Sequence, residues 1–331
     1  MMTVGVAIIT WKDAKRLPKV LGPVLNSTIN GVKPRVVVFN SSGNDGTVEL
    51  AKEMGAETLV VPRTEMNHGW MREKSRKFLG TDIFVAITGD CILKDEKVLE
   101  KLVKPIMEGK AAVAYARQLP NEQANVISRF GKDFSYPAES NIRGIEDVGK
   151  YGVYTAFCSD ACCAWSSKVL DEVDGFRWVM AGEDAVAASM LVKKGYKVAY
   201  VAEAEVIHSH NYTLKVEFVR HFHTGMYRKQ WDPVLNLGGG GDEKRGANYA
   251  TSLLRHVWKN EPKLIFLAFL SLVFGFVGYK FGRFVYKRLP TSWYLFFSPP
   301  WGPADFFWPS VGYKAGLWNE PIDSEKLIFK E

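Results

Sequence analysis

The chain has 331 residues, of which 47% are hydrophobic and 13% aromatic. This composition excludes a disordered or fibrous protein, and the length allows one large domain with an appended region. Lysine and arginine exceed the acidic residues by 43 to 36, which gives a net charge of +7. Such a moderate basic excess suits a phosphate-bearing substrate or an anionic membrane surface. No nucleic-acid partner is expected.

The N-terminal segment and the cysteines indicate the compartment. Residues 4–11, VGVAIITW, have the β-rich apolar pattern of a first strand and do not follow a basic, signal-like stretch. The four cysteines lack zinc-ligand spacing, and two of them, Cys162 and Cys163, are adjacent. We therefore expect reduced, mostly buried thiols and a catalytic portion inside the cell.

Strand and helix patterns alternate along the first two hundred residues. A helical pattern follows the first strand, and a second helix is predicted to end at Gly55. The other predicted strands are near-continuous apolar runs at 35–40, 57–62, 82–90, 111–118 and 196–201. Such runs are typical of a sheet that is covered on both faces. The predicted fold is an α/β sandwich around a mostly parallel sheet, with ligands bound beyond the carboxyl ends of the strands.

Polar segments follow several of these strands. NSSGNDGT (40–47) has residues suited to a nucleotide, although a surface turn uses the same residue types. NHGWMREKSRK (67–77) places basic residues at a predicted helix start, which suits pyrophosphate binding or a solvated helix face. Asp90 ends the strand at 82–90 and is suited to a divalent cation, but a single carboxylate is a weak signal.

Two adjacent acids, Glu183 and Asp184, precede a helical pattern and then an apolar strand. Carboxylates in a first helical turn accept hydrogen bonds from backbone N–H groups that have no partner within the helix. Their negative charge is also stabilised by the positive end of the helix dipole. A catalytic pair is the alternative, and the two interpretations cannot be separated on this segment alone.

Taken together, the motifs resemble the family 2 glycosyltransferases of the GT-A fold, and more narrowly a rhamnosyltransferase-like branch. The resemblance rests on segments that occur in the order shown by that branch. They are NSSGNDGTVELA (40–51), NHGWMR (67–72), TGD (88–90), ARQLP (116–120), FSYPAES (134–140), GED (182–184) and VIHSHNYTL (206–214). It covers about residues 4–232 and implies an inverting, metal-dependent hexosyltransferase.

The resemblance also implies roles for the donor side of the site. Thr10, Asn40 and Asp45 would contact the nucleoside of a nucleotide-diphosphate sugar. Gly89 and Asp90 would complete the donor site, and Arg72 would face the diphosphate. The sugar and the nucleotide base stay open.

On the metal and acceptor side, Asp90 and His208 would bind Mg²⁺ or Mn²⁺. Asp184 would be the general base that deprotonates the acceptor hydroxyl, and Glu183 would orient the base or the acceptor. The catalytic interpretation of the acidic pair is then favoured, with capping as a supporting role for Glu183.

The composition changes after residue 250. Residues 264–279 are sixteen uncharged, mainly apolar residues, which as a helix would measure about 24 Å, short of the roughly 30 Å hydrocarbon core of a bilayer. Lys280, Arg283, Lys287 and Arg288 follow, and then an aromatic segment at 293–309 suited to a membrane interface. A homodimer built on the same helix, or a helix that covers part of the core, is the alternative.

The predicted organisation is a GT-A catalytic domain at 1–235, a flexible loop and helical linker at 236–262, and a membrane-associating region at 263–331. The predicted function is sugar transfer to a lipid-linked or polysaccharide acceptor, at the cytoplasmic face of the cell membrane, by a peripheral or monotopic enzyme. The alternative is a soluble nucleotide-sugar-binding or pyrophosphorylase-type enzyme, although TWKDAKRLPK (10–19) lacks the glycine cluster expected of a pyrophosphorylase.

Overall fold

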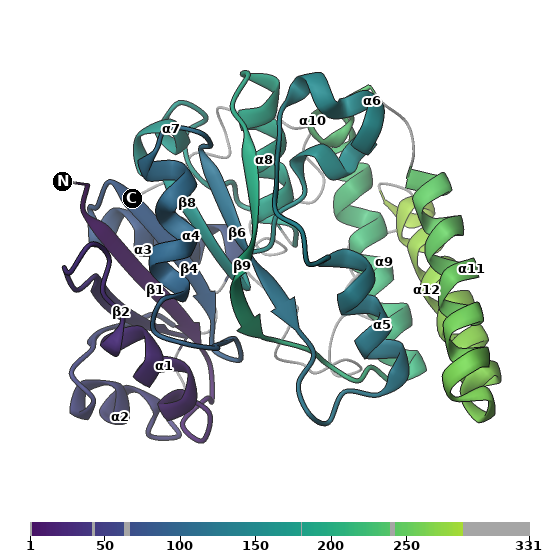
Figure 1. The fold of residues 1–331 in the computed structure, drawn as a ribbon, viewed down its shortest axis with the longest axis horizontal. Coiled ribbons are helices and arrows are strands. Elements are labelled where there is room, and N and C mark those ends of the chain that lie inside the picture. The colour runs from purple at the N-terminus through teal and green to yellow at the C-terminus, as the bar shows by residue number, and fades with distance from the viewer. Residues whose placement is uncertain (1, 42–43, 63–66, 180, 239–241, 287–331) are drawn as a thin grey trace.

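The structure, a computed structural model, describes residues 2–41, 44–62, 67–179, 181–238 and 242–286. Its centre is a nine-stranded sheet with the order β3-β2-β1-β4-β8-β6-β9-β5, and β7 pairs with β9 (Figure 1). The strands are β1 Val4–Thr10, β2 Arg35–Asn40, β3 Glu57–Val60, β4 Ile83–Thr88, β5 Ile92–Leu93, β6 Val113–Leu119, β7 Asn141–Arg143, β8 Cys162–Ser166 and β9 Val198–Ile207.

Helices surround this sheet and continue beyond it. Within the described part of the chain the α-helices are α1 Leu17–Asn26, α2 Thr47–Glu53, α3 His68–Leu79, α4 Val98–Met107, α5 Val126–Ser135, α6 Val148–Tyr151, α7 Ser167–Asp171, α8 Glu183–Lys193, α9 Leu214–Gln230, α10 Asp232–Leu235, α11 Asp242–Asn260 and α12 Ile265–Val285. The predicted α/β sandwich is confirmed, and the predicted strands agree with β1, β2, β3, β4, β6 and β9.

Both faces of the sheet are buried, because alternate strand residues enter two apolar cores. Val6 and Ile8 of β1 pack with α1 and α4, whereas Ala7 packs on the other face with residues of α3, α7 and α8. Burial on both faces explains why these strands are near-continuous apolar runs. All four cysteines are buried and free, as expected from the sequence.

The central strand β8 was not predicted, and neither were the short strands β5 and β7. β8 lies between β4 and β6 and runs antiparallel to both, while β1 pairs in parallel with β2 and β4, and β6 with β9. Its sequence, CCAWS, is only five residues long, so periodicity did not separate it from its surroundings.

The register of the parallel strands brings the strand ends together. Thr10 is paired with Asn40, and Ile9 with Thr88, so the segment after β4 emerges beside the end of β1. The residues that follow β1, β2 and β4 therefore share one edge of the sheet, where ligands bind in open α/β folds.

A group of helices formed by α5, α9, α11 and α12 lies beside the sheet (Figure 1). α12 packs closely along α9 through glycines. A Cβ atom on Gly278 would lie 2.4 Å from the carbonyl oxygen of Phe218, and one on Gly282 would lie 2.0 Å from that of Phe222. Only residues without a Cβ allow the two backbones to approach so closely.

α12 is otherwise exposed and apolar. The helical segment Pro262–Val285 has 24 residues, and its most apolar 18-residue window has a mean hydropathy of 2.1 and is only 17% buried. At 1.5 Å per residue this segment measures about 36 Å, so the length expected from residues 264–279 was too short. The helix continues past Lys280, and its length alone is compatible with a membrane crossing. The predicted residues Lys287 and Arg288 and the aromatic segment 293–309 lie outside the described residues.

Candidate active site

A large cavity of about 1990 Å³ opens at the carboxyl edge of the sheet. It begins at Thr10, Ser41 and Thr88, which follow or end β1, β2 and β4, and it continues between the helices of the neighbouring group. The predicted site residues Thr10, Arg72, Gly89, Asp90 and His208 all line it.

Asp90 lies at the centre of a cluster with two histidines. Its carboxylate is 3.5 Å from Nε2 of His208 and 3.2 Å from Nε2 of His210. One potential ligand atom from each residue lies within 4.8 Å of the others. A carboxylate oxygen and two imidazole nitrogens form a donor set that suits Mn²⁺ and related divalent ions. The residues present therefore fit the metal that the sequence predicts.

Local structure explains how the two histidines meet Asp90. They are two positions apart in the extended segment that follows β9, so their side chains project from the same face. The Nδ1 atom of His208 is 2.8 Å from the amide oxygen of Gln118, which also accepts a hydrogen bond from Lys132 at 2.5 Å. His208 was predicted from the sequence, whereas His210 was not, although the HSH spacing itself could have indicated it.

The ionisation of the cluster favours a cation. Burial alone would raise the pKa of Asp90, but hydrogen bonds with His208 and His210 outweigh it and hold that pKa well below its usual range. Burial lowers the pKa of His208 and favours the neutral imidazole that a metal needs. Burial also lowers the pKa of Lys132, to about 8.

Gly89 has a steric role at this edge. A Cβ atom there would lie 2.4 Å from the carboxylate of Asp13, which is buried beneath the strand ends. Asp13 accepts hydrogen bonds from the backbone of Trp11 and from Arg16, and it was not singled out from the sequence. Its carboxylate fixes the loop after β1, next to the position of Asp90.

The three residues predicted to contact the nucleoside lie in two different environments. The amide of Asn40 donates a hydrogen bond to the hydroxyl of Thr10, and both side chains are buried at the sheet edge. Asp45 is exposed and accepts hydrogen bonds from the Thr47 hydroxyl and the Ala14 backbone, so it joins two loops at the start of α2. Thr10 lines the cavity, whereas Asn40 and Asp45 are not among its lining residues.

The acidic pair at the start of α8 belongs to a buried charge cluster. Nε of Arg72 lies 2.5 Å from Oδ2 of Asp160 and 2.9 Å from Oε1 of Glu183. Asp160 also accepts a hydrogen bond from the indole of Trp165 at 2.8 Å. Two protein carboxylates thus neutralise Arg72, which is only 2% exposed but still lines the cavity. Asp160 was not singled out from the sequence.

Asp184 follows Glu183 and faces the same cluster. Its carboxylate accepts hydrogen bonds from the backbone N–H groups of Asp160, at 3.2 Å, and Ala185, at 2.7 Å. Burial raises its pKa to about 8, and the charges of Glu183 and Asp160 act in the same direction. α8 begins at Glu183, so both acids lie in its first turn, and no side chain caps the helix at Gly182. A carboxyl group with a raised pKa is suited to general acid–base chemistry, although neither Glu183 nor Asp184 is among the residues that line the cavity.

The family can now be assigned. The profile described as "Glycosyltransferase like family 2" matches residues 2–226, which include the whole sheet, the Asp90 cluster and the Arg72 cluster. The chain belongs to this family. It is therefore a glycosyltransferase, as the resemblance predicted.

Similar proteins agree over most of the chain. The O-antigen chain rhamnosyltransferase RfbN of Salmonella typhimurium is 32% identical over 90% of this chain and 94% of its own length. The O-antigen chain rhamnosyltransferase WbaN of Salmonella anatum is 32% identical over 80% of this chain and 84% of its own length. The chain thus has the rhamnosyltransferase-like character that the sequence predicted.

Solved structures show the same fold at low identity. A mannosyltransferase from Pyrobaculum calidifontis, in complex with GDP-Man and Mn²⁺, has a TM-score of 0.55 and 13% identity, and the match covers 84% of this glycosyltransferase and 87% of that chain. TarS 1–349 of S. aureus has a TM-score of 0.50 and 12% identity, and the match covers 87% and 92% of the two chains. The GT-A fold is therefore confirmed.

Proposed function

We propose that this glycosyltransferase moves a sugar, rhamnose in the first instance, from a nucleotide-diphosphate donor to a hydroxyl group of a lipid-linked or polysaccharide acceptor. The Asp90–His208–His210 cluster at the sheet edge carries the proposal, because it offers a metal site where a diphosphate would lie beyond the strand ends. The names of the two Salmonella relatives support the sugar and the polysaccharide product.

The reaction is an inverting single displacement. The acceptor oxygen forms a bond to the anomeric carbon while the bond from that carbon to the diphosphate breaks, and the diphosphate leaves with the electron pair. Asp184, in its deprotonated form, takes the proton of the acceptor hydroxyl. Glu183 and Asp160 hold Arg72 beside Asp184, so their charges set the protonation of the base.

Asp90, His208 and His210 would hold Mg²⁺ or Mn²⁺ in this site. A bound divalent ion supplies positive charge that stabilises the diphosphate as its negative charge increases. Thr10 and Asn40 lie near the position of the nucleoside, at the paired ends of β1 and β2. The family and the fold do not favour the alternative of a pyrophosphorylase-type or non-catalytic nucleotide-sugar-binding protein.

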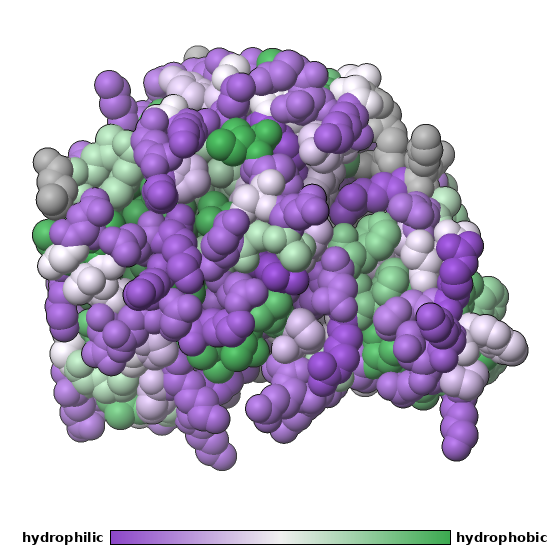
Figure 2. Space-filling view, in the orientation of Figure 1, coloured by the Kyte–Doolittle hydropathy of each residue, from purple (hydrophilic) through white to green (hydrophobic). Residues whose placement is uncertain are grey.

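The same proposal places the enzyme at the cytoplasmic face of the membrane, with α12 in contact with lipid. Large apolar side chains of α12 are exposed, among them Phe266 at 68%, Phe276 at 63% and Phe284 at 55%. Apolar residues are visible between hydrophilic ones where α11 and α12 lie (Figure 2). Because soluble monomers seldom expose a contiguous patch of this kind, contact with lipid accounts for it. A homodimer on this face is the alternative.

The decisive experiment is a donor panel. Purified enzyme is incubated with several nucleotide sugars, including a nucleotide-activated rhamnose, and release of the nucleoside diphosphate is measured with Mn²⁺, with Mg²⁺ and with a chelator. We expect metal-dependent release from one donor, increased by an acceptor. Undiminished release in the chelator would reject the metal site, and absence of release or binding across the panel would reject the donor class.

A further inference from the structure

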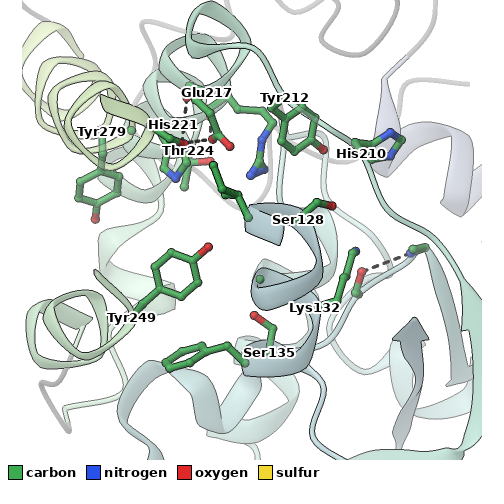
Figure 3. A pocket seen from close by; sticks show the side chains of 18 of the residues that line it. Ser128, Lys132, Ser135, His210, Tyr212, Glu217, His221, Thr224, Tyr249 and Tyr279 are labelled. Carbon is green, nitrogen blue, oxygen red and sulfur yellow. Dashed lines mark hydrogen bonds and ion pairs between the residues drawn. The ribbon is translucent and has the colours of Figure 1, made fainter. Parts of the chain in front are cut away.

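The cavity is too large for the donor alone. Pockets for single small molecules measure roughly 300–1,000 Å³, whereas this cavity measures about 1990 Å³. One end contains Thr10, Gly89 and Asp90, as described above. The other end, which we name the helical arm, extends between α5, α9, α11 and α12 (Figure 3). The helical arm is defined here by Ser128, Phe134, Ser135, Glu217, Thr224 and Tyr249.

Aromatic rings form one part of the helical arm. The ring of Tyr249, from α11, projects into the space in front of α5 (Figure 3). It meets the ring of Phe134 edge-on, with centroids 5.1 Å apart and an interplanar angle of 82°. Gly131 lies behind this pair, and a Cβ atom there would be 3.3 Å from the Tyr249 hydroxyl. The α5 backbone at Gly131 therefore lies close to the tip of the Tyr249 side chain, and a larger residue at position 131 would crowd it.

The other four residues that define the helical arm are polar, and apolar side chains such as Leu253 and Leu272 also line this end of the cavity. The hydroxyl groups of Ser128, Ser135 and Tyr249 have no hydrogen-bond partner among the residues that the structure describes. Glu217 is only 14% exposed, and its carboxylate lies 3.3 Å from Nδ1 of His221. Burial would raise the pKa of Glu217, but His221 and the charge of Arg220 outweigh it, so the pKa is lowered and the group is an acceptor.

The aromatic rings and polar groups of the helical arm together favour one class of ligand. Apolar rings beside unpartnered hydroxyls and one carboxylate complement a molecule that has C–H faces and a rim of hydroxyl groups. At the six residues that define the helical arm, a hydrocarbon chain would pack against the rings but would remove water from Glu217 and the three hydroxyls without replacing their hydrogen bonds, which is costly. A saccharide satisfies both kinds of group.

We propose that the helical arm is the subsite for a sugar unit of the acceptor, held by Tyr249 and Phe134 and oriented by Glu217. The inference rests on the proposed function, since it assumes that the donor occupies the opposite end. Arg245, Tyr249 and the rest of α11 follow residue 226, where the family match ends, so the family profile does not account for this wall of the cavity. The other five residues that define the helical arm lie within the family match, as the donor end does.

The test measures two affinities on the same protein. The probes are the methyl glycosides of rhamnose, galactose, glucose, mannose and N-acetylglucosamine, added with Mn²⁺ and a nucleoside diphosphate, and calorimetry gives both dissociation constants. We expect Tyr249→Ala and Phe134→Ala each to weaken the best glycoside about tenfold or more, which corresponds to ~1.4 kcal/mol, because each removes an aromatic ring from the proposed contact. Affinity for the nucleoside diphosphate should change less than about twofold.

Two further variants test whether a loss of glycoside affinity comes from misfolding. Thr251→Ala is on the same helix but is exposed and outside the cavity lining, so glycoside affinity should not change. Tyr249→Phe keeps the ring and removes only the hydroxyl, and it should weaken the glycoside by several-fold. Unchanged glycoside binding in Tyr249→Ala, or no glycoside binding to wild-type enzyme that binds the nucleoside diphosphate, would overturn the inference. Failure of wild-type enzyme to bind any nucleoside diphosphate would instead contradict the proposed function.

Discussion

Arg72 and Glu183 form a buried ion pair that joins α3 to the start of α8, with 2.9 Å between Nε and Oε1. The two residues are far apart in the sequence, from which Arg72 was predicted to face the diphosphate and Glu183 to orient the base or the acceptor. Their pairing, together with Asp160, shows that the charges around Asp184 are organised by the protein itself. Arg72 is therefore a positioning residue in the proposed reaction.

The first prediction concerns the stability of this cluster. Arg72→Met should lower the free energy of unfolding by about 3–5 kcal/mol, because Asp160, Glu183 and Asp184 would then have no buried cation. Lys74→Met is the control, since Lys74 is an exposed cation on the same helix, and its effect should stay within about 1 kcal/mol. Urea unfolding followed by circular dichroism gives both values, and equal losses in the two variants would refute the assignment.

The second prediction concerns pH. A base works only when it is deprotonated, and the pKa of Asp184 is raised to about 8, so kcat should increase with pH and reach half its maximum near pH 8. The charge of Glu183 helps to raise that pKa, so Glu183→Gln should move the midpoint to lower pH. Initial rates of nucleoside diphosphate release in the presence of an acceptor, between pH 6 and 9.5, measure this shift.

Removal of the base itself is the third prediction. Asp184→Asn should lower kcat by about a hundredfold or more while donor binding is retained. Asp133→Asn, which changes an exposed carboxylate on α5, should leave kcat unchanged. Near-normal turnover in Asp184→Asn would remove Asp184 from the mechanism, and a pH profile identical to that of the wild type in Glu183→Gln would separate Glu183 from the base.

The fourth prediction concerns the metal. Asp90→Ala, His208→Ala and His210→Ala should each weaken Mn²⁺ binding by roughly tenfold or more in the presence of a nucleoside diphosphate, because each removes one ligand. His256→Ala, a change on α11 away from the cluster, is the matched control. Titration followed by electron paramagnetic resonance of Mn²⁺ measures the affinity. If His210→Ala binds Mn²⁺ as the wild type does, the site consists of Asp90 and His208 alone.

The fifth prediction concerns the exposed face of α12. Replacing Phe266, Val277 and Phe284 together by serine should reduce flotation with liposomes, because each side chain is at least 48% exposed and available to lipid. The matched control replaces Val32, Val60 and Phe78, which are exposed on the catalytic domain, and should leave flotation unchanged.

The competing dimer gives a different result in parallel size-exclusion chromatography. If α12 instead forms a dimer interface, the α12 variant should elute at a different volume from the wild type. The wild-type enzyme should then not bind vesicles. Wild-type enzyme that stays at the bottom of the gradient with both neutral and anionic vesicles would reject the membrane contact.

The sequence by itself determined the layered fold and the donor edge of the site. Hydrophobic periodicity reports which faces of an element are buried, and the apolar runs of β1, β2 and β4 are buried on both faces as expected. Since parallel strands end at the same edge, the strand pattern alone was enough to bring together the residues at those strand ends, Thr10 and Asp90 among them.

Only the tertiary structure decided how the charged residues are partnered. Periodicity does not say which buried side chain meets which, so the pairing of Arg72 with two carboxylates from distant segments, Asp160 and Glu183, could not be predicted. The antiparallel β8 and the close α9–α12 contact at Gly278 likewise depend on neighbours that are remote in sequence. Contacts of this kind arise from packing in three dimensions, and for the same reason the helical arm between α5 and α11 could not be predicted from any local segment.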